Sequence, residues 1–254
     1  MTIIPPIQPG DGIGAERNRL LTAFPPLARE RLRSHLEVVQ LETGQLLREA
    51  GEPIRDVWFP RTCVCSLLVV FEKEPPVEGT TVGCEGMVGL PIALYGHSSN
   101  LRAIAQVPGE AVRLPADALR EVLDAEPGVR PPILRYALAL TEQTAQSVAC
   151  NSRHTLEQRC ARWLLRTHDR VGRDEFLLTQ EFLAQMLGVR RASVSEAAGD
   201  MQAKGYIRYS RGRVRITNRA GLETIACECY RAVAARYRAM EEEMAEQAES
   251  AQRA

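Results

Sequence analysis

The sequence predicts an α+β protein with an antiparallel, β-rich N-terminal domain, a long connecting helix and a C-terminal winged helix-turn-helix domain. Three observations lead to this fold class. Short β-type runs separated by turn residues occupy residues 38–114, and helical periodicity replaces them after Pro115. A helix pair followed by an arginine-rich hairpin then occupies residues 179–216. The spacing of the strands fits an antiparallel barrel or sandwich.

Composition excludes several classes of protein before any motif is considered. The 254 residues are enough for two modest domains. No apolar run approaches the roughly 20 residues of a membrane span, and the first residues lack a signal-peptide pattern, so we expect a cytoplasmic protein with no membrane partner. The seven cysteines are odd in number and scattered, which favours reduced thiols over a disulfide framework.

The elements follow one another in a recognisable order. A helical pattern at residues 18–37, interrupted by Pro25 and Pro26, precedes the strands. The strand-like runs are VVQL, DVWF, TCVCSLLVVF, RAIAQV and EAVRL, and the run ADALREVLDAE after them reads as a helix that stops at Pro127 and Gly128. A longer helix is expected at about residues 132–150, and a further amphipathic helix at residues 154–172.

One face of the longer helix carries an apolar seam at alternating spacings of four and three residues. Two interpretations remain open, because two heptads are too few to establish a coiled coil: a core helix, or a seam along which two chains pair. The members of this seam are Leu134, Leu138, Thr141, Ala145 and Val148.

The zero net charge of the chain hides a basic region. Residues 153–219 hold 14 Arg or Lys against 7 Asp or Glu, a net charge of +7, so the remainder carries −7. Within it, KGYIRYSRGRVRITNR (residues 204–219) has six basic residues and no acidic one. A basic block in an otherwise neutral chain indicates a surface that faces a polyanion.

The stretch TQEFLAQMLGVRRASVSEAAGDMQAKG (residues 179–205) reads as two helices joined by a tight turn. Gly188 permits the positive φ of the turn, and Ala184 is small where two helix backbones approach. The remaining positions expected to face the core are apolar: Leu183, Leu187, Val189, Val194 and Ala197. An ordinary antiparallel helix pair is the alternative, but it does not explain the basic charge that follows.

The second helix is expected at about residues 190–203. If Val194 and Ala197 face inward, the residues on its outer face lie near the helix N-terminus, which is the end that enters a DNA major groove. Arg191 can present a bidentate fork to guanine, and Glu196 can accept a hydrogen bond from cytosine N4. We expect these two side chains to read bases. Three neighbours are expected to touch bases or phosphates: Arg190, Ser193 and Ser195.

Two further segments are expected to hold the DNA backbone. Thr179 and Gln180 precede the first helix of the pair as an N-cap pair, where free backbone amides favour a phosphate. YIRYSRGRVRI (residues 206–216) reads as a hairpin that turns at Arg211 and Gly212. Arg211 and Arg213 on this wing are therefore expected to bind phosphates.

These motifs resemble the Crp/Fnr family of bacterial transcription regulators. The resemblance covers about residues 20–230 and rests on four segments: GQLLREAGEPIRDVWFP (44–60), GCEGMVGLP (83–91), TLEQRCARWLL (155–165) and LTQEFLAQMLGVRRASVSEAAGDMQAKGYIRYSRGRVRI (178–216). It implies a cyclic-nucleotide-binding-like β-roll or jelly-roll effector domain (19–125), a dimerisation helix (126–152) and a winged helix-turn-helix domain (153–220). Before these, the Pro- and Gly-rich composition of residues 1–18 predicts a flexible arm, and after them the sequence predicts a C-terminal helix with an acidic tail (221–254).

The resemblance also implies partners. It implies a homodimer on a palindromic double-stranded DNA operator, with RNA polymerase as a further candidate partner. The family's usual Arg, Glu and second Arg of the recognition helix fall here on Arg191, Ala192 and Glu196. Because two of the three differ, the operator is expected to differ from the best-known family consensus.

The effector site departs from the cyclic-nucleotide-binding members of the family. Their Gly-Glu pair for the ribose corresponds to Gly89 and Leu90, and their Arg-Ser pair for the cyclic phosphate corresponds to Ser99 and Asn100. Arg102 lies close in sequence as a substitute. We therefore expect a regulator that does not depend on cAMP and that has another small-molecule effector or none.

The cysteines do not predict a metal site or a cofactor. Iron–sulfur members of the family place several cysteines in the N-terminal arm, and none occurs here. Cys63 and Cys65 would share one face of a strand, whereas Cys227 and Cys229 on a helix would point about 200° apart. Buried structural thiols are expected at both pairs, with thiol-based sensing at the first pair left open.

Catalytic residues are not expected. PGDGIG (residues 9–14) looks like a dehydrogenase glycine motif, but no alternating βαβ pattern follows it. The alternative to a DNA-binding regulator is a ligand- or thiol-redox-sensing protein whose output is mainly contact with another protein. The acidic tail MEEEMAEQAESAQRA (residues 240–254) is expected to be a solvated end of the last helix or a partner-binding segment.

Overall fold

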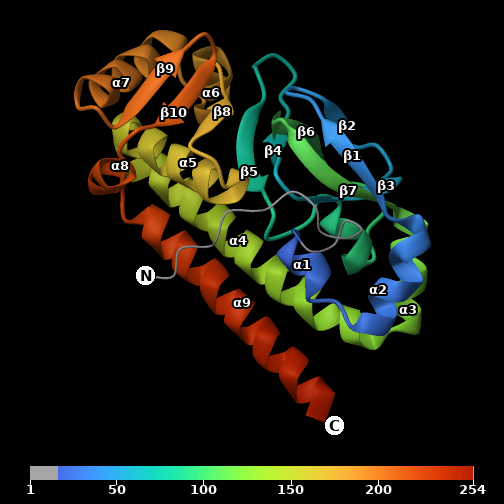
Figure 1. The fold of residues 1–254 in the computed structure, drawn as a ribbon. Coiled ribbons are helices and arrows are strands. Elements are labelled where there is room, and N and C mark those ends of the chain that lie inside the picture. The colour runs from blue at the N-terminus through green and yellow to red at the C-terminus, as the bar shows by residue number, and fades with distance from the viewer. Residues whose placement is uncertain (1–16, 254) are drawn as a thin grey trace.

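The computed structural model describes residues 17–253 and confirms the α+β class (Figure 1). The PGDGIG segment and all of the predicted arm except residues 17 and 18 lie outside the described residues. Asn18 is not part of a flexible arm, because it is fully buried and caps the first helix. Its side-chain amide donates hydrogen bonds to the carbonyl oxygens of Pro60 (2.9 Å) and Gly86 (2.8 Å).

The N-terminal domain is built from two antiparallel sheets, as the strand spacing predicted. One sheet has the order β1-β7-β3 and the other the order β2-β6-β4-β5. The strands are β1 (Glu37–Leu41), β2 (Leu46–Arg48), β3 (Asp56–Pro60), β4 (Val64–Val69), β5 (Val77–Val82), β6 (Leu101–Val107) and β7 (Gly109–Pro115). The central strands contribute buried apolar residues to the interior, among them Val64 and Leu68 of β4 and Val112 and Leu114 of β7.

Short helices close the ends of this β-roll. They are α1 (Arg19–Thr22), α2 (Pro26–Leu32), η1 (Arg33–His35), η2 (Leu90–Leu94), α3 (Ala116–Ala125) and η3 (Pro127–Val129). α3 ends just before Pro127 and Gly128, as predicted. Its apolar face, with Leu119 and Val122, belongs to the core of the N-terminal domain.

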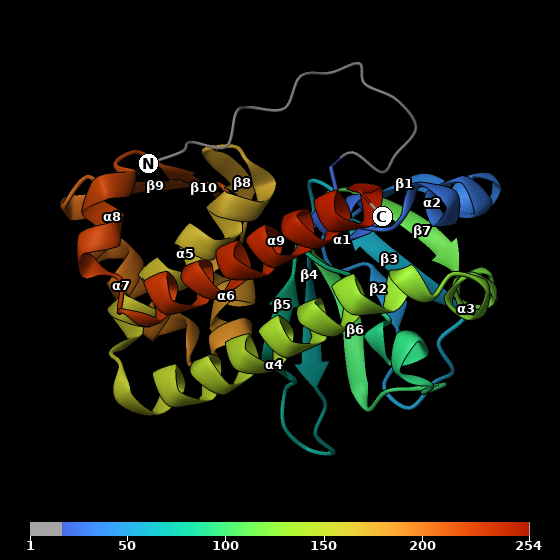
Figure 2. The same ribbon diagram turned by 90° about the horizontal axis from the view of Figure 1, so that it is seen from below.

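Two long helices run side by side along the molecule, α4 (Arg130–Arg153) and α9 (Cys229–Arg253), as Figures 1 and 2 show. The inner face of α4, with Ile133 and Tyr136, packs on the β-roll. All five members of the predicted apolar seam, Leu134, Leu138, Thr141, Ala145 and Val148, are exposed on its outer face. α4 is therefore both a core helix and the carrier of an apolar seam that this chain leaves uncovered.

The expectation of a solvated acidic tail is wrong for its first part. Tyr237, Met240 and Met244 of α9 are at most 7 % exposed and belong to the main core, together with Tyr136 of α4. Acidic residues between them form ion pairs across the contact, for example Glu243 with Arg135 at 3.4 Å. Met240 and Met244 lie on the buried face of α9, and the acidic residues between them lie on its charged face.

The C-terminal domain is a small helical unit with a three-stranded sheet, which Figure 1 shows at the opposite end of α9 from the C-terminus. The sheet has the order β8-β10-β9, and its strands are β8 (Glu175–Leu177), β9 (Ile207–Ser210) and β10 (Arg213–Ile216). Its helices are α5 (Leu156–Val171), α6 (Gln180–Leu187), α7 (Arg191–Ala203) and α8 (Arg219–Ile225). A second hydrophobic core, formed mainly by residues of α5, α6, α7 and the sheet, holds this unit together, and Val64 and Val107 of the β-roll join it.

No helix among the described residues is long and apolar enough to cross a membrane.

Candidate DNA interface

The turn between α6 and α7 has the geometry that its residue types predicted. Gly188 is the C-cap residue of α6, and its φ of +64° lies in the left-handed region that glycine adopts without strain. Ala184 is 2 % exposed where the two helices approach. Val194 and Ala197 are buried, and Val189 packs against the same core. The residues predicted to face inward do so, which leaves the opposite face of α7 to solvent.

The exposed face of α7 begins at its N-terminus. Arg190 is the N-cap residue, and Arg191, Ala192 and Glu196 are exposed. The Arg191 guanidinium has only a loose contact with Glu181 at 3.8 Å, and its side chain is 68 % exposed. Ser193 is half-buried. This end of α7 therefore offers a charged fork beside small side chains, with no strong internal partner to compete for it.

The start of α6 lies beside this face. Thr179 is the N-cap of α6, and its hydroxyl accepts a hydrogen bond from the backbone amide of Phe182 at 3.1 Å. Gln180 is not a cap residue, because it is the first residue of the helix, and its side-chain oxygen accepts from the Ser195 hydroxyl at 2.7 Å. The polar pair Gln180 and Ser195 therefore fixes α6 against α7.

The predicted wing is present, with the predicted turn. β9 and β10 pair in antiparallel register, with Arg213 opposite Ser210. Arg211 has φ of +49° and Gly212 has φ of +74°, the two positive values of a type I′ hairpin turn. The Leu178 backbone amide donates to the Gly212 carbonyl oxygen at 2.9 Å, which places the wing tip next to the N-terminus of α6.

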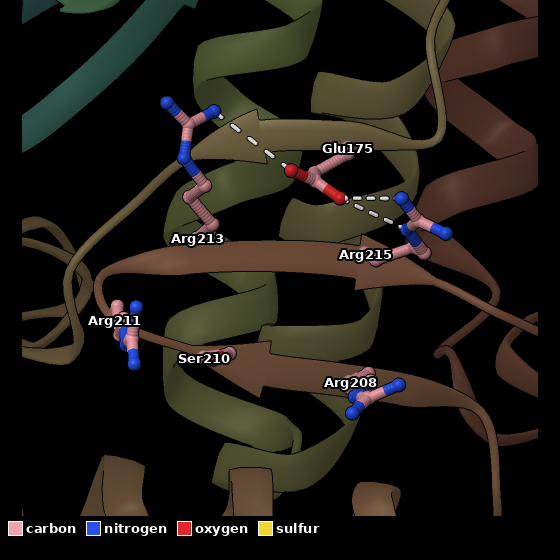
Figure 3. Close-up of a pocket in the computed structure, with 6 residues that line it drawn as sticks. All are labelled: Glu175, Arg208, Ser210, Arg211, Arg213 and Arg215. Carbon is pink, nitrogen blue, oxygen red and sulfur yellow. Dashed lines mark hydrogen bonds and ion pairs between the residues drawn. The ribbon is translucent and has the colours of Figure 1, made fainter.

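The outer face of the wing holds a concentration of arginines, shown in Figure 3. These arginines line a surface cavity of about 430 Å³, whose lining residues are Glu175, Arg208, Ser210, Arg211, Arg213 and Arg215. Glu175 forms an ion pair with Arg215 at 2.8 Å and a longer one with Arg213 at 3.8 Å. Arg208 and Arg215 share this face with Arg211 and Arg213, as the alternation of arginine with apolar residues along YIRYSRGRVRI indicates.

The C-terminal domain is fastened to the β-roll through α5. Arg170 of α5 enters the loop after β5, where its guanidinium forms an ion pair with Glu85 at 2.5 Å. The side chains of Arg170 and Glu85 are 3 % and 5 % exposed. Arg170 also donates to the carbonyl oxygen of Thr81 (3.1 Å) and to the side-chain oxygen of Gln143 on α4 (3.1 Å). Three elements therefore meet at one buried charge.

Burial alone would raise the pKa of the Glu85 carboxyl. The combined attraction of Arg170 and Arg166, together with hydrogen bonds to the carboxylate, outweighs burial, so the pKa lies below its usual value. Both partners are therefore charged near neutral pH.

The residues predicted for an effector pocket are held by separate local contacts. Gly89 and Leu90 stand at the start of η2, where Gly89 has φ of +100° and packs against Val57 of β3. Ser99 caps its own turn by accepting from the Leu101 amide at 3.2 Å, and Asn100 is exposed beside it. Arg102 is held by Glu49 in an ion pair at 2.7 Å.

A surface cavity of about 340 Å³ in the same domain is lined by a different set, Leu47, Arg48, Glu52, Pro53, Arg55 and Asp56.

The first cysteine pair is placed as expected. Cys63 and Cys65 are both fully buried, and a hydrogen bond with Cys63 together with burial raises the pKa of the Cys65 thiol well above its usual range. Reactive thiols need exposure and a lowered pKa, so this environment favours a structural role.

The expectation that Cys227 and Cys229 diverge on a helix is wrong. α9 begins at Cys229, and Cys227 lies in the connection before it.

Comparison with known proteins gives a consistent result. Residues 158–225 match the family model of the Crp-like helix-turn-helix domain. No curated protein matches the chain. Among solved structures, FixK2 from Bradyrhizobium japonicum is similar with a TM-score of 0.65 and 16% identity, over 76% of this chain and 98% of that one.

A CRP-family transcriptional regulator from Thermus thermophilus has a TM-score of 0.60 and 21% identity, over 74% of this chain and 96% of its own. The c-di-GMP-responsive global regulator CLP from Xanthomonas campestris has a TM-score of 0.53 and 14% identity, over 76% and 99%. At these identities the similarity establishes the fold. It does not identify the effector or the operator sequence of this chain.

Proposed function

Residues 158–225 belong to the Crp-like helix-turn-helix domains, and the chain has the fold of the Crp/Fnr regulators; from this premise we propose that it is a homodimeric, sequence-specific DNA-binding transcription regulator of the bacterial cytoplasm. The observation that carries the proposal is the exposed face of α7. Arg191, Ala192 and Glu196 stand there at the helix end that a major groove admits, with the start of α6 and the wing beside them.

Each part of this surface has a role in the proposal. Arg191 and Glu196 read base edges. The amides at the start of α6, capped by Thr179, and the wing residues Arg211 and Arg213 hold phosphates and set the register. Gln180 and Ser195 keep the two helices in place, and their bond leaves Ser195 less free for DNA than Ser193.

The outer face of α4 supports the dimer. Leu134, Leu138 and Val148 are 54 %, 52 % and 67 % exposed and follow one line along the helix. Apolar side chains at this spacing are what a paired helix buries. A second copy of α4 would cover them and place the two recognition helices at two half-sites of a palindrome, about one helical turn of DNA apart. RNA polymerase as a direct partner stays a prediction.

Independence from cAMP is the third part of the proposal. Arg102, which follows the expected phosphate position in the sequence, is already paired with Glu49, and Gly89 packs against Val57 of β3. A buried cyclic phosphate would therefore lack Arg102 as a charge-assisted partner unless the pair between Arg102 and Glu49 broke. The effector, if one exists, has a different chemistry.

The test of sequence-specific binding is a selection of random duplexes on the purified protein, with no ligand added and at two salt concentrations. Enrichment of a palindrome supports the proposal. Weak binding that is salt-sensitive and blind to sequence would contradict it and favour the alternative, a sensor whose output is protein contact. Adding cAMP to the same assay checks the effector: affinity raised by about tenfold or more would overturn cAMP independence.

Two arginine variants separate base reading from phosphate binding. Arg191→Ala should cost about 1–3 kcal/mol on the selected site and relax the preference at one base pair. Arg213→Ala should weaken binding to all sequences alike and reduce the slope of log K against log salt by about 1. Arg33→Ala is the matched control, because its side chain is 59 % exposed in the β-roll and should change neither property. Equal losses on specific and random DNA for both variants would refute the assignment.

The dimer is tested by one substitution on the seam. Leu138→Glu should give a monomer in sedimentation velocity and lose the palindrome preference, because a buried, unpaired carboxylate opposes pairing of the two helices. Leu27→Glu on α2 is the control, since Leu27 is 56 % exposed and lies outside the seam. A dimer that survives Leu138→Glu would place the interface elsewhere.

A further inference from the structure

We propose that the chain holds one zinc ion at a site made of Cys150, His154, Cys227 and Cys229. Cys150 lies in the last turn of α4, and His154 is the C-cap residue of that helix. Cys227 and Cys229 come from the connection between α8 and α9 and from the first residue of α9. The four side chains meet where the two long helices converge, beneath the C-terminal domain.

The distances suit a single tetrahedral ion. All four ligand atoms lie within 4.8 Å of one another. The Sγ atoms of Cys150 and Cys227 are 3.5 Å apart, and the Cys229 Sγ is 3.6 Å from the His154 Nδ1. A tetrahedral zinc with Zn–S bonds of about 2.3 Å and Zn–N bonds of about 2.0–2.1 Å separates two sulfurs by about 3.8 Å, and a sulfur from a nitrogen by about 3.6 Å.

The sulfur distance also distinguishes the site from a disulfide. A disulfide bond is about 2.05 Å long, so the Cys150 and Cys227 sulfurs are separate thiols, as are all seven cysteines. The three cysteines of the site are at most 3 % exposed and form a small cluster apart from the two apolar cores. Their grouping is therefore not explained by a shared core.

The donor set selects the class of metal. Three thiolates and one imidazole form one of the known structural zinc sets, and hard cations such as Mg²⁺ and Ca²⁺ prefer oxygen ligands. Cys150 and His154 are four residues apart at the end of α4, so helical geometry directs both to one side. Four protein ligands complete a tetrahedron and leave no open position, which is the arrangement of a structural site.

Neighbouring side chains orient the ligands as metal sites require. The His154 Nε2 lies 3.2 Å from a carboxylate oxygen of Glu228, which leaves Nδ1 directed at Cys229. A carboxylate behind a ligating histidine fixes its tautomer and raises its basicity. The Gln146 side-chain amide donates to the Cys229 sulfur at 3.0 Å, a contact that stabilises negative charge on sulfur.

The position of the site gives the ion a structural task. The C-terminal domain begins at Thr155, directly after His154, and ends directly before Cys227. The four ligands therefore flank this domain at both of its chain connections. One ion would bind the end of α4 to the start of α9 and hold both connections at a fixed distance.

Metal analysis of the full-length protein tests the site without any DNA measurement, so its failure is distinguishable from failure of the proposed function. Protein purified with reductant and without chelator should contain one zinc ion per chain. Replacement of zinc by Co²⁺ should give the visible absorption of a tetrahedral cobalt thiolate. Cys150→Ala should lose the metal, whereas Cys160→Ala should retain it, because Cys160 is equally buried but lies on α5 outside the cluster.

A second variant keeps the test decisive if Cys150→Ala does not fold. His154→Cys preserves four ligands, so it should still bind Co²⁺, with stronger sulfur-to-cobalt charge-transfer absorption. Three results would each overturn the proposal: wild-type protein that stays metal-free after refolding with Zn²⁺, equal metal content in the Cys150→Ala and Cys160→Ala variants, or a disulfide between Cys150 and Cys227 in the freshly purified protein.

Discussion

The buried ion pair between Arg170 and Glu85 should dominate the stability of the contact between the two domains. The substitution Glu85→Gln keeps the shape of the side chain and removes its charge. Arg170 is then left 3 % exposed with neutral hydrogen-bond acceptors, the carbonyl and hydroxyl oxygens of Thr81 and the side chain of Gln143. Breaking a buried pair by removing one partner costs about 3–5 kcal/mol, because the remaining charge stays desolvated.

This cost is large enough for a simple assay. For a chain of this size each kcal/mol lowers Tm by about 2–4 °C, so Glu85→Gln should melt roughly 6–20 °C below the wild type. Glu30→Gln is the control, because Glu30 and its partner Arg33 are 69 % and 59 % exposed. An exposed pair contributes about 0–1 kcal/mol.

A double variant distinguishes loss of the pair from general disruption. Arg170→Met should also be destabilising, but combined with Glu85→Gln it should cost about 1–3 kcal/mol less than the sum of the single costs. Urea unfolding of the four proteins measures this difference. If Glu85→Gln lies within about 0.5 kcal/mol of the wild type, in the range of ordinary surface substitutions, the reasoning is refuted.

The ion pair between Arg170 and Glu85 also predicts that the free energy of unfolding depends on pH in the acid range. Because the folded-state pKa of Glu85 is lowered, its contribution to stability is present above the unfolded pKa of about 4.3 and is lost as pH falls through the folded value. The stability difference between wild type and Glu85→Gln should therefore be constant near neutral pH and shrink below about pH 4. A difference that persists unchanged at low pH would contradict this assignment.

Three further substitutions test local packing. Gly86→Ala should destabilise by about 1–3 kcal/mol in urea unfolding, because a Cβ there would lie 2.0 Å from the buried ring of Tyr136; a neutral effect would mean that the ring can move. Gly199→Ala, in α7 with nothing within 4 Å of the new Cβ, should stabilise by about 0.5–1 kcal/mol, and a loss would argue against the helix there. Thr155→Ala should cost about 1 kcal/mol by removing the capping box that Thr155 forms with Gln158, while Thr155→Ser retains it; equal stability of the two would contradict the cap.

The helix-turn-helix and the wing could be predicted from the sequence because their signals are local. Gly188, the small Ala184 and the buried Val194 fall within one short segment, and the alternation of arginine with apolar residues marks both strands of the wing. Helical and strand periodicities are properties of neighbouring residues, so no distant contact was needed to recognise them.

Other elements depend on contacts that the sequence does not display. The strand β5 was missed because its sequence, VEGTTV, has polar residues and a glycine. Its burial comes from contacts with β4 and α4 and, across the domain contact, with α6. The buried face of α9 has a visible series, Val233, Tyr237, Met240 and Met244, but the acidic residues between them favoured a solvated reading.

The candidate metal site was missed for a topological reason. Cys150 and Cys229 are separated by the whole C-terminal domain and meet only because α9 returns along α4. The interpretation of Cys227 and Cys229 as divergent assumed that both belong to a helix. Since the helix starts at the second of them, the first is free to turn back toward α4.

The return of α9 along α4 has a consequence for how the nascent chain folds on the ribosome. Met240 and Met244 belong to the core of the N-terminal domain, although they follow the whole C-terminal domain in the sequence. Domains usually fold as units in the order of synthesis. Here the β-roll emerges before α9 and must wait, with part of its apolar surface uncovered, until the C-terminal domain and the buried part of α9 have left the exit tunnel.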